Sequence, residues 1–188
     1  MGRPDEAVGN AERRMQYDPL TAANPHMYRW ARQYQQAIDA AKILTDYDYS
    51  YLLTLCYQQL GMEEEEFQWF MQFDGDTEAK IRSYDAAYDG SGMKGVWRLF
   101  IENELTSGPR EERFGYGKFF DVAATYAYLS EKDKAFDWQD KLVERPVAHP
   151  FVVDPRFDSL RSDPRFEELL RKLKLPEEAI QRHLALYE

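Results

Sequence analysis

Apolar residues recur at helical spacing along most of the chain, and short breaks divide them into paired segments. The clearest pair begins with the apolar run Tyr51–Tyr57, is interrupted at Gly61, and resumes over Glu63–Phe73 with aromatic residues three or four positions apart. Such spacing places the apolar side chains on one face of a helix. A glycine between two helical segments favours a tight turn. The pattern therefore predicts a helix, a turn and a second helix.

Two further copies of this pattern follow in the same order. The second copy consists of Ile81–Tyr88, a break at Gly90–Gly92, and Val96–Leu105. The third consists of Phe119–Leu129, a polar break at Ser130–Asp133, and Ala135–Val143. The corresponding tyrosines of the three copies are Tyr57, Tyr88 and Tyr126, and their spacing is close to the period of about 34 residues that marks stacked helical hairpins. Because aromatic residues at helical spacing usually pack between hairpins, all three are predicted to lie in the core.

The upstream part of the chain adds one complete and one partial hairpin. Asn24 and Pro25 are a suitable cap and first-turn residue for a short helix, and Tyr34–Leu44 follows as its partner. Before them, the segment near 2–18 matches only the second helix of a hairpin. The predicted hairpins thus span 24–45, 48–74, 77–106 and 116–145, and together with the lone helix they form a repeat domain over residues 1–150.

Residues 151–188 are predicted to cap the last hairpin. The tandem motifs Asp154–Phe157 and Asp163–Phe166 share the sequence Asp-Pro-Arg-Phe. Asp can cap a helix while Pro occupies the first turn, where its missing N–H costs nothing, so each motif predicts a helix start. A last helix, Glu177–Tyr187, follows Pro176, and these elements are expected to cover the open face of the last hairpin.

The order of small residues, tyrosines and breaks from Gly2 to about Pro176 resembles tetratricopeptide (TPR) repeats. The stretch from Lys134–Glu144 through Asp154–Phe166 is similar to one bacterial subfamily, in which a TPR array ends a larger protein behind a winged-helix DNA-binding domain, an adenylyl cyclase or a Ser/Thr kinase domain. The resemblance implies an all-α superhelix of stacked antiparallel hairpins. Three residues depart from the family pattern: Glu66 and Trp97 replace the small helix-crossing residue, and Ser130 replaces the turn glycine.

In the family that this sequence resembles, the first helix of every hairpin lines a concave groove that holds a protein or peptide. Matching the sequence to that pattern gives a predicted partner-binding groove formed by Tyr51, Leu55, Gln58, Gln59, Arg82, Asp89, Phe120, Ala124 and Tyr128. Rigid aromatic and hydrogen-bonding side chains of this kind suit a peptide or a helix better than a small charged metabolite.

Charge and cysteine content narrow the classes of partner. The formal net charge is -10, which would repel a phosphate backbone, so nucleic acid and anionic membranes are not expected partners. No apolar stretch is long enough to span a bilayer, and no signal pattern precedes the repeats, which predicts a cytoplasmic protein. The single cysteine, Cys56, has no second cysteine to pair with and lies in an apolar run, so a buried and inert thiol is expected.

No motif in the sequence predicts catalysis, a cofactor or a metal. His26, His149 and His183 stand in no metal-ligand spacing with each other or with a Cys or acid pattern. The run Gly90–Gly95 lacks the preceding strand and the Gly-Lys-Ser/Thr ending of a phosphate-binding loop. The leading interpretation is therefore a non-catalytic scaffold for protein–protein interaction. The alternatives are a C-terminal regulatory segment of a larger bacterial regulator or kinase, and an enzyme whose site has no sequence signature.

The helix predicted over Arg3–Tyr17 bears on self-association. Its apolar stripe has no preceding first helix to cover one side, and a solenoid end without a polar cap tends to find a partner. This favours a weak homodimer through the N-terminal helix. The alternative is that the stripe packs fully on the Tyr34–Leu44 hairpin and the chain stays monomeric.

Overall fold

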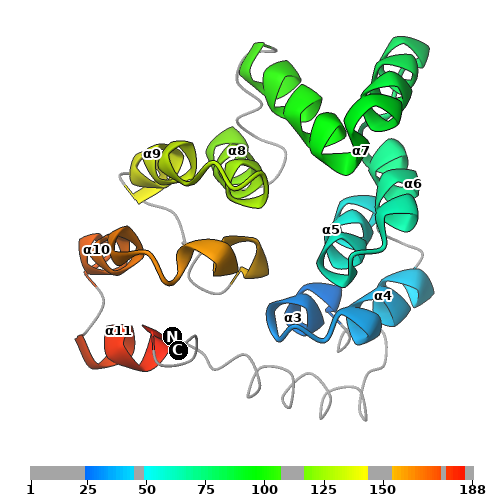
Figure 1. The fold of residues 1–188 in the computed structure, drawn as a ribbon. Coiled ribbons are helices and arrows are strands. Elements are labelled where there is room, and N and C mark those ends of the chain that lie inside the picture. Colours follow the sequence, from blue (N-terminus) through cyan, green and yellow to red (C-terminus); the bar gives the residue numbers. More distant parts are fainter. Residues whose placement is uncertain (1–23, 45–48, 107–116, 144–153, 175–176, 185–188) are drawn as a thin grey trace. The chain divides into compact units, whose positions relative to one another are not determined.

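The computed structural model describes residues 24–44, 49–106, 117–143, 154–174 and 177–184. Every regular element within these ranges is a helix, which confirms the predicted all-α class (Figure 1). The lone helix predicted near 2–18, and with it the proposed dimer contact, lies outside the described residues. The chain divides into two compact units, Met1–Val96 and Trp97–Glu188. No helix within the described ranges is long and apolar enough to cross a membrane.

The first unit contains α3 (Pro25–Trp30), α4 (Tyr34–Ile43), α5 (Ser50–Leu60), α6 (Glu63–Asp74) and the beginning of α7 (Glu78–Thr106). The hairpins predicted over 24–45 and 48–74 correspond to α3–α4 and α5–α6. The predicted cap of the first is confirmed, since the Asn24 side chain accepts a hydrogen bond from the His26 N–H at 3.0 Å. The core of these helices is formed by Tyr28, Ala37, Ile38, Leu52, Leu53, Cys56 and Tyr57.

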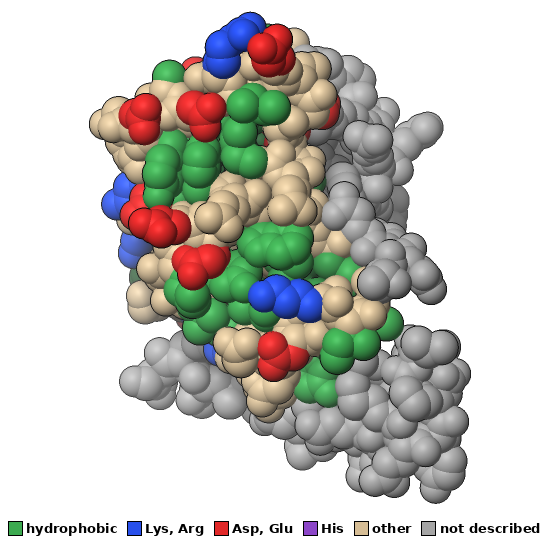
Figure 2. All heavy atoms as spheres, turned by 90° about the vertical axis from the view of Figure 1, so that its right-hand side faces the viewer, with side chains coloured by type: hydrophobic (Ala, Val, Ile, Leu, Met, Phe, Trp, Pro, Cys, Tyr) green, Lys and Arg blue, Asp and Glu red, His purple; other side chains and the backbone are tan. Residues whose placement is uncertain are grey.

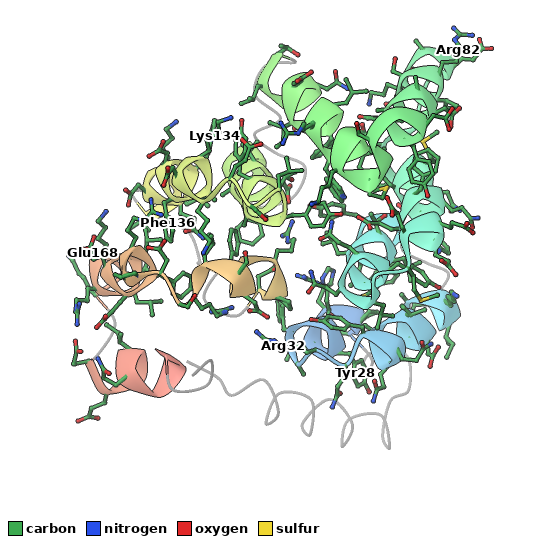
Figure 3. The ribbon with its side chains drawn as sticks, in the orientation of Figure 1. Tyr28, Arg32, Arg82, Lys134, Phe136 and Glu168 are labelled. Atoms are coloured by element: carbon green, nitrogen blue, oxygen red, sulfur yellow. The ribbon has the colours of Figure 1, made fainter. Side chains whose placement is uncertain are left out.

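Three hairpin turns in the described chain share one backbone geometry. Arg32, Gly61 and Ser130 each adopt a left-handed conformation, with φ of 60°, 68° and 63°. In each turn, the N–H of that residue donates to the carbonyl three positions back, and the following N–H donates to the carbonyl five positions back. This pair of bonds is the Schellman motif, which satisfies the last carbonyls of the first helix. The turn therefore recurs whether the residue is glycine or not (Arg32 is labelled in Figure 3).

The common turn places equivalent residues at the start of the second helices. Ala37, Glu66 and Ala135 each lie five positions after the left-handed residue, and each donates its N–H to the carbonyl of the residue that follows the turn. All three are buried, as helix-crossing positions should be. Glu66 is tolerated there because its carboxylate Oε1 accepts a hydrogen bond from Gln58 Nε2 at 3.0 Å. A buried polar group costs little when it is hydrogen-bonded.

The break predicted within the third hairpin is present but differs from the other turns. The helical path of α7 is interrupted at Ser91 and Gly92, where Gly92 has φ 59° and ψ −157°. This region of backbone space is populated almost only by glycine. The next N–H, that of Met93, donates to Oε1 of Glu63 at 2.7 Å. The first residue of α6 therefore caps the helical segment that begins after the break.

Replacing Gly92 should test this account of the break. We expect Gly92→Ala to lower the free energy of unfolding by about 2 kcal/mol, because a side chain there is strained and the new Cβ would meet the Glu63 carboxylate. Gly90→Ala is the matched control, since a Cβ there meets nothing within 4 Å and alanine favours a helix, so it should be neutral or slightly stabilising. Urea denaturation followed by circular dichroism measures both, and equal midpoints would contradict the prediction.

The second unit contains the end of α7, α8 (Gly117–Tyr128), α9 (Lys132–Val143), the short 3₁₀ helix η2 (Pro155–Leu160), α10 (Pro164–Lys172) and α11 (Glu177–Leu184). The hairpin predicted over 116–145 corresponds to α8–α9, and the helix starts predicted at Asp154 and Asp163 are confirmed. Phe136 lies between α9 and α10 (Figure 3). A single core joins the hairpin to the C-terminal elements, formed by residues such as Phe120, Ala127, Phe136, Phe157, Phe166, Leu170 and Ile180.

Candidate functional site

The four predicted groove residues of α5 differ in how they are exposed. Leu55 is buried and so is not available to a partner, which corrects its assignment. Tyr51 is half-buried and stacks on Phe73, with ring centroids 4.4 Å apart. Gln58 and Gln59 are also half-buried, and Gln58 is engaged by Glu66. The accessible part of the predicted groove on α5 therefore consists of Tyr51, Gln58 and Gln59.

The two predicted groove residues of α7 in the first unit are both exposed. Arg82 points away from the ribbon in Figure 3 and forms an ion pair with Glu78 one turn earlier, at 3.2 Å. Asp89 lies two turns further along the same helix and is also exposed. Both side chains are available to a partner, and an exposed ion pair such as Arg82–Glu78 costs little to separate.

In the second unit, two of the three predicted groove residues are buried, which corrects the sequence-based assignment. Phe120 packs edge-on against Phe157, with ring centroids 5.4 Å apart, and Ala124 belongs to the same core. The cause is tertiary, because η2 packs against the face of α8 that the repeat pattern left open. Tyr128 is half-buried beside Trp97, with ring centroids 6.3 Å apart, and keeps an accessible surface.

A surface that the sequence did not single out runs along α6 and the first part of α7. On α6, Glu64, Phe67 and Met71 occur at i, i+3 and i+7, and on α7, Ile81, Asp85 and Tyr88 occur at i, i+4 and i+7. Each set lies on one helix face, and all six side chains are exposed or half-buried. We call these six residues the α6–α7 stripe. Its centre is the stacked pair Phe67 and Tyr88, whose ring centroids are 4.1 Å apart at an interplanar angle of 12°.

Tyr57, Tyr88 and Tyr126 were predicted to lie in the core. Tyr57 is buried and Tyr126 is half-buried against the core of the second unit, whereas Tyr88 is half-buried in the α6–α7 stripe. Partial burial raises the pKa of the Tyr88 hydroxyl above its usual value, and the carboxylates of Glu63, Glu64 and Glu66 raise it further. The tyrosine hydroxyl therefore lies in a negative electrostatic environment. In Figure 2, a group of hydrophobic side chains at the height of α6 and α7 is bordered by Asp and Glu side chains.

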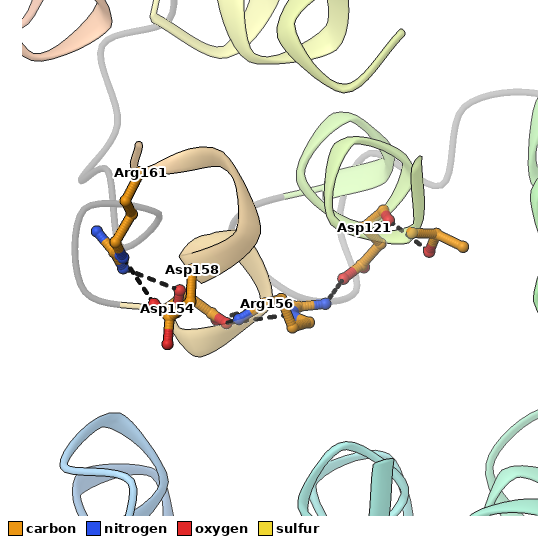
Figure 4. Close-up of polar contacts among 6 residues, drawn as sticks. Asp121, Asp154, Arg156, Asp158 and Arg161 are labelled. Atoms are coloured by element: carbon orange, nitrogen blue, oxygen red, sulfur yellow. Dashed lines mark hydrogen bonds and ion pairs between the residues drawn. The ribbon is translucent and has the colours of Figure 1, made fainter. Parts of the chain in front are cut away.

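The tandem Asp-Pro-Arg-Phe motifs form two matching clamps on the last hairpin. In the first, the Asp154 side chain caps η2 by accepting from the Arg156 N–H, and the Arg156 guanidinium folds back on the Asp154 carboxylate at 3.2 and 3.3 Å (Figure 4). The remaining Arg156 nitrogen, Nη1, donates to Asp121 of α8 at 3.1 Å. The guanidinium carbon also lies 4.7 Å from the centre of the Phe120 ring.

The second motif repeats these contacts on α9. Arg165 folds back on its own cap, Asp163, donates through Nη1 to Asp133 at 2.7 Å, and lies over the ring of Phe136 at 4.2 Å. Hydrogen bonds from Arg165 lower the pKa of Asp163 to about 2, so this carboxylate remains charged except in strong acid. Each motif thus attaches one helix start to one helix of the hairpin. The sequence indicated the helix starts but not these attachments.

The described residues contain no group of three or more His, Cys, Asp or Glu that could hold a metal ion. Among the histidines, His26 lies near the rings of Trp30 and Tyr49, with centroids 6.1 and 6.3 Å away. His149 and the side chain of His183 lie outside the described residues.

Comparison of the chain with protein-family models, curated proteins and solved structures found no match. The functional interpretation therefore rests on the residues and their geometry.

Cys56 provides a test of the core of the first unit. The side chain is fully buried, and burial raises the pKa of its thiol to about 12. Since the thiolate is the reactive form, we expect the native protein to resist alkylation by iodoacetamide at pH 8 and to react readily in concentrated urea. Mass spectrometry over a time course measures the difference. Equal rates with and without urea would contradict the buried position.

Proposed function

We propose that this chain is a non-catalytic protein-interaction module built from TPR-like helical hairpins. The observation that supports this most directly is the recurrence of one hairpin turn, with the same two hydrogen bonds at Arg32, Gly61 and Ser130. Repetition of one supersecondary unit is the structural basis of helical repeat proteins, which characteristically present extended surfaces to protein partners. A protein-binding role follows by analogy with such repeat proteins.

The accessible first-helix side chains are of the types that form protein interfaces. Tyr51 and Tyr128 provide rigid aromatic surface, while Gln59 and Asp89 provide hydrogen-bonding groups. Aromatic side chains that are already held by packing, as Tyr51 is held by Phe73, lose little conformational entropy on binding. This favours a peptide or protein ligand over a small metabolite.

Affinity capture with the purified chain, followed by calorimetric titration with the purified captured protein, tests the proposal. We expect saturable binding that Tyr51→Ala weakens by about 2 kcal/mol, the size of an interface hot spot, while circular dichroism stays unchanged. Glu168→Ala, an exposed change on α10, is the control and should bind normally. If no purified protein binds saturably, the proposal is wrong.

A further inference from the structure

We propose that the α6–α7 stripe is a docking surface for a basic amphipathic segment of a partner protein, one that presents arginine or lysine beside apolar side chains. The inference rests on the proposed function, because it assumes that the chain binds proteins, and it adds a second surface and the chemistry of its ligand. The surface is distinct from the predicted first-helix groove, since half of it belongs to α6, a second helix.

The stripe has apolar surface that no described element covers. Phe67, Met71 and Tyr88 are half-buried, and Ile81 is 38% exposed. Met62, directly before α6, is also 38% exposed. Exposed apolar residues that follow one another along two adjacent helices provide the kind of surface on which an amphipathic helix packs.

The surface is held in one shape by contacts beneath it. The ring of Phe70 meets that of Tyr84 edge-on at a centroid distance of 5.0 Å, and the Tyr84 hydroxyl donates to the buried carboxylate of Asp74. Lys80 also binds this carboxylate, at 3.1 Å. These contacts join α6 to α7 from below, so the Phe67–Tyr88 pair above them is preorganised. A preorganised surface costs less conformational entropy when a ligand binds.

Charge complementarity identifies the ligand. The exposed acids Glu63, Glu64 and Asp85 border the aromatic pair, and none of them forms an ion pair with a Lys or Arg of the described chain. Over residues 61–92, nine acidic residues accompany two basic ones. A guanidinium can stack on an aromatic ring while it pairs with a neighbouring carboxylate, so arginine suits this combination best. An acidic segment would be repelled by these carboxylates. A purely apolar segment would remove water from them without supplying a cation.

The probe is a synthetic amphipathic peptide of about 15 residues, with leucines on one helix face and arginines on the other. Two peptides serve as comparisons: one with glutamate in place of arginine, and one with the leucine–arginine sequence scrambled so that no face is apolar. Fluorescence anisotropy with labelled peptide measures the dissociation constant. We expect the amphipathic basic peptide to bind at least about tenfold more tightly than either comparison, and less tightly at high salt.

Matched variants locate the binding. The pair Glu64→Lys and Asp85→Lys should weaken binding of the basic peptide by about tenfold or more, whereas Glu102→Lys with Asp137→Lys, an equal change in net charge at exposed positions of the second unit, should change it less than about threefold. Likewise, Ile81→Ser should weaken binding while Leu105→Ser, at 40% exposure, should not. Circular dichroism verifies that every variant is folded.

Three outcomes would overturn the inference. The first is failure of the basic peptide to bind, and the second is equal binding of the scrambled peptide. The third is an equal loss of affinity in the two charge-reversal pairs, because this would show that the peptide responds only to net charge. None of these outcomes contradicts the proposed interaction module, which is judged by the captured partner and the Tyr51 variant. If a captured partner binds both charge-reversal variants equally well, the proposed interaction module still holds. The stripe is then not the docking surface for that partner.

Discussion

Arg156→Met is expected to destabilise the second unit by about 3–5 kcal/mol. The Arg156 side chain is 6% exposed and bridges two carboxylates, those of Asp154 in the same motif and Asp121 on α8. Asp154 is itself 2% exposed, so removal of the guanidinium would take two hydrogen bonds and the charge of Arg156 from a buried carboxylate. Methionine keeps most of the side-chain volume, which isolates the loss of charge from the loss of packing. Urea denaturation followed by circular dichroism measures the effect.

The second clamp supplies the control for this prediction. Arg165→Met removes the same set of contacts, yet Arg165 is 42% exposed and its partner Asp133 is 91% exposed. Water screens exposed ion pairs, so this variant should cost only about 0–1 kcal/mol. Equal losses in the two variants would show that burial does not set the strength of the clamps. A small loss in both would show that the Asp-Pro-Arg-Phe motifs act only as helix caps.

Ala135→Trp is expected to destabilise the same unit by about 3 kcal/mol through overpacking. Ala135 is 0% exposed and lies five positions after the turn at Ser130, where α8 and α9 pack closely. Trp97 lies five positions after Gly92, but there the backbone leaves the turn with ψ −157°, compared with 23° at Gly61. The break at Gly92 therefore differs in backbone geometry from the tight turns, and the position after it holds the much larger Trp97.

Asp137→Trp is the matched control on the same helix, because Asp137 is exposed and a surface change of this kind usually alters stability by no more than about 0.5 kcal/mol. The denaturant midpoints of the two variants should differ clearly. Coincident midpoints would mean that Ala135 is not the helix-crossing residue. Ala37→Trp extends the test to the first unit, where Ala37 holds the equivalent position and is also 0% exposed.

The sequence by itself determined the helices and most of their ends. Asn24, Asp154 and Asp163 act as caps through bonds to residues two positions away, and Gly61 ends α5 through bonds within the preceding turn. These interactions are local, so residue type and spacing are enough to predict them. The left-handed turn at Arg32 could not be predicted in this way, because arginine does not favour that backbone conformation.

Only the tertiary structure decided which helix faces are covered. Phe120 and Ala124 were assigned to a groove and are buried, because η2 packs on that face of α8. Tyr88 was assigned to the core and contributes to a half-buried aromatic pair. The arginines of the two identical Asp-Pro-Arg-Phe motifs differ in exposure for the same reason, with Arg156 at 6% and Arg165 at 42%. Whether a residue is buried depends on segments far away in the sequence that pack against it. Helical periodicity shows which residues share a helix face, but not what lies against that face.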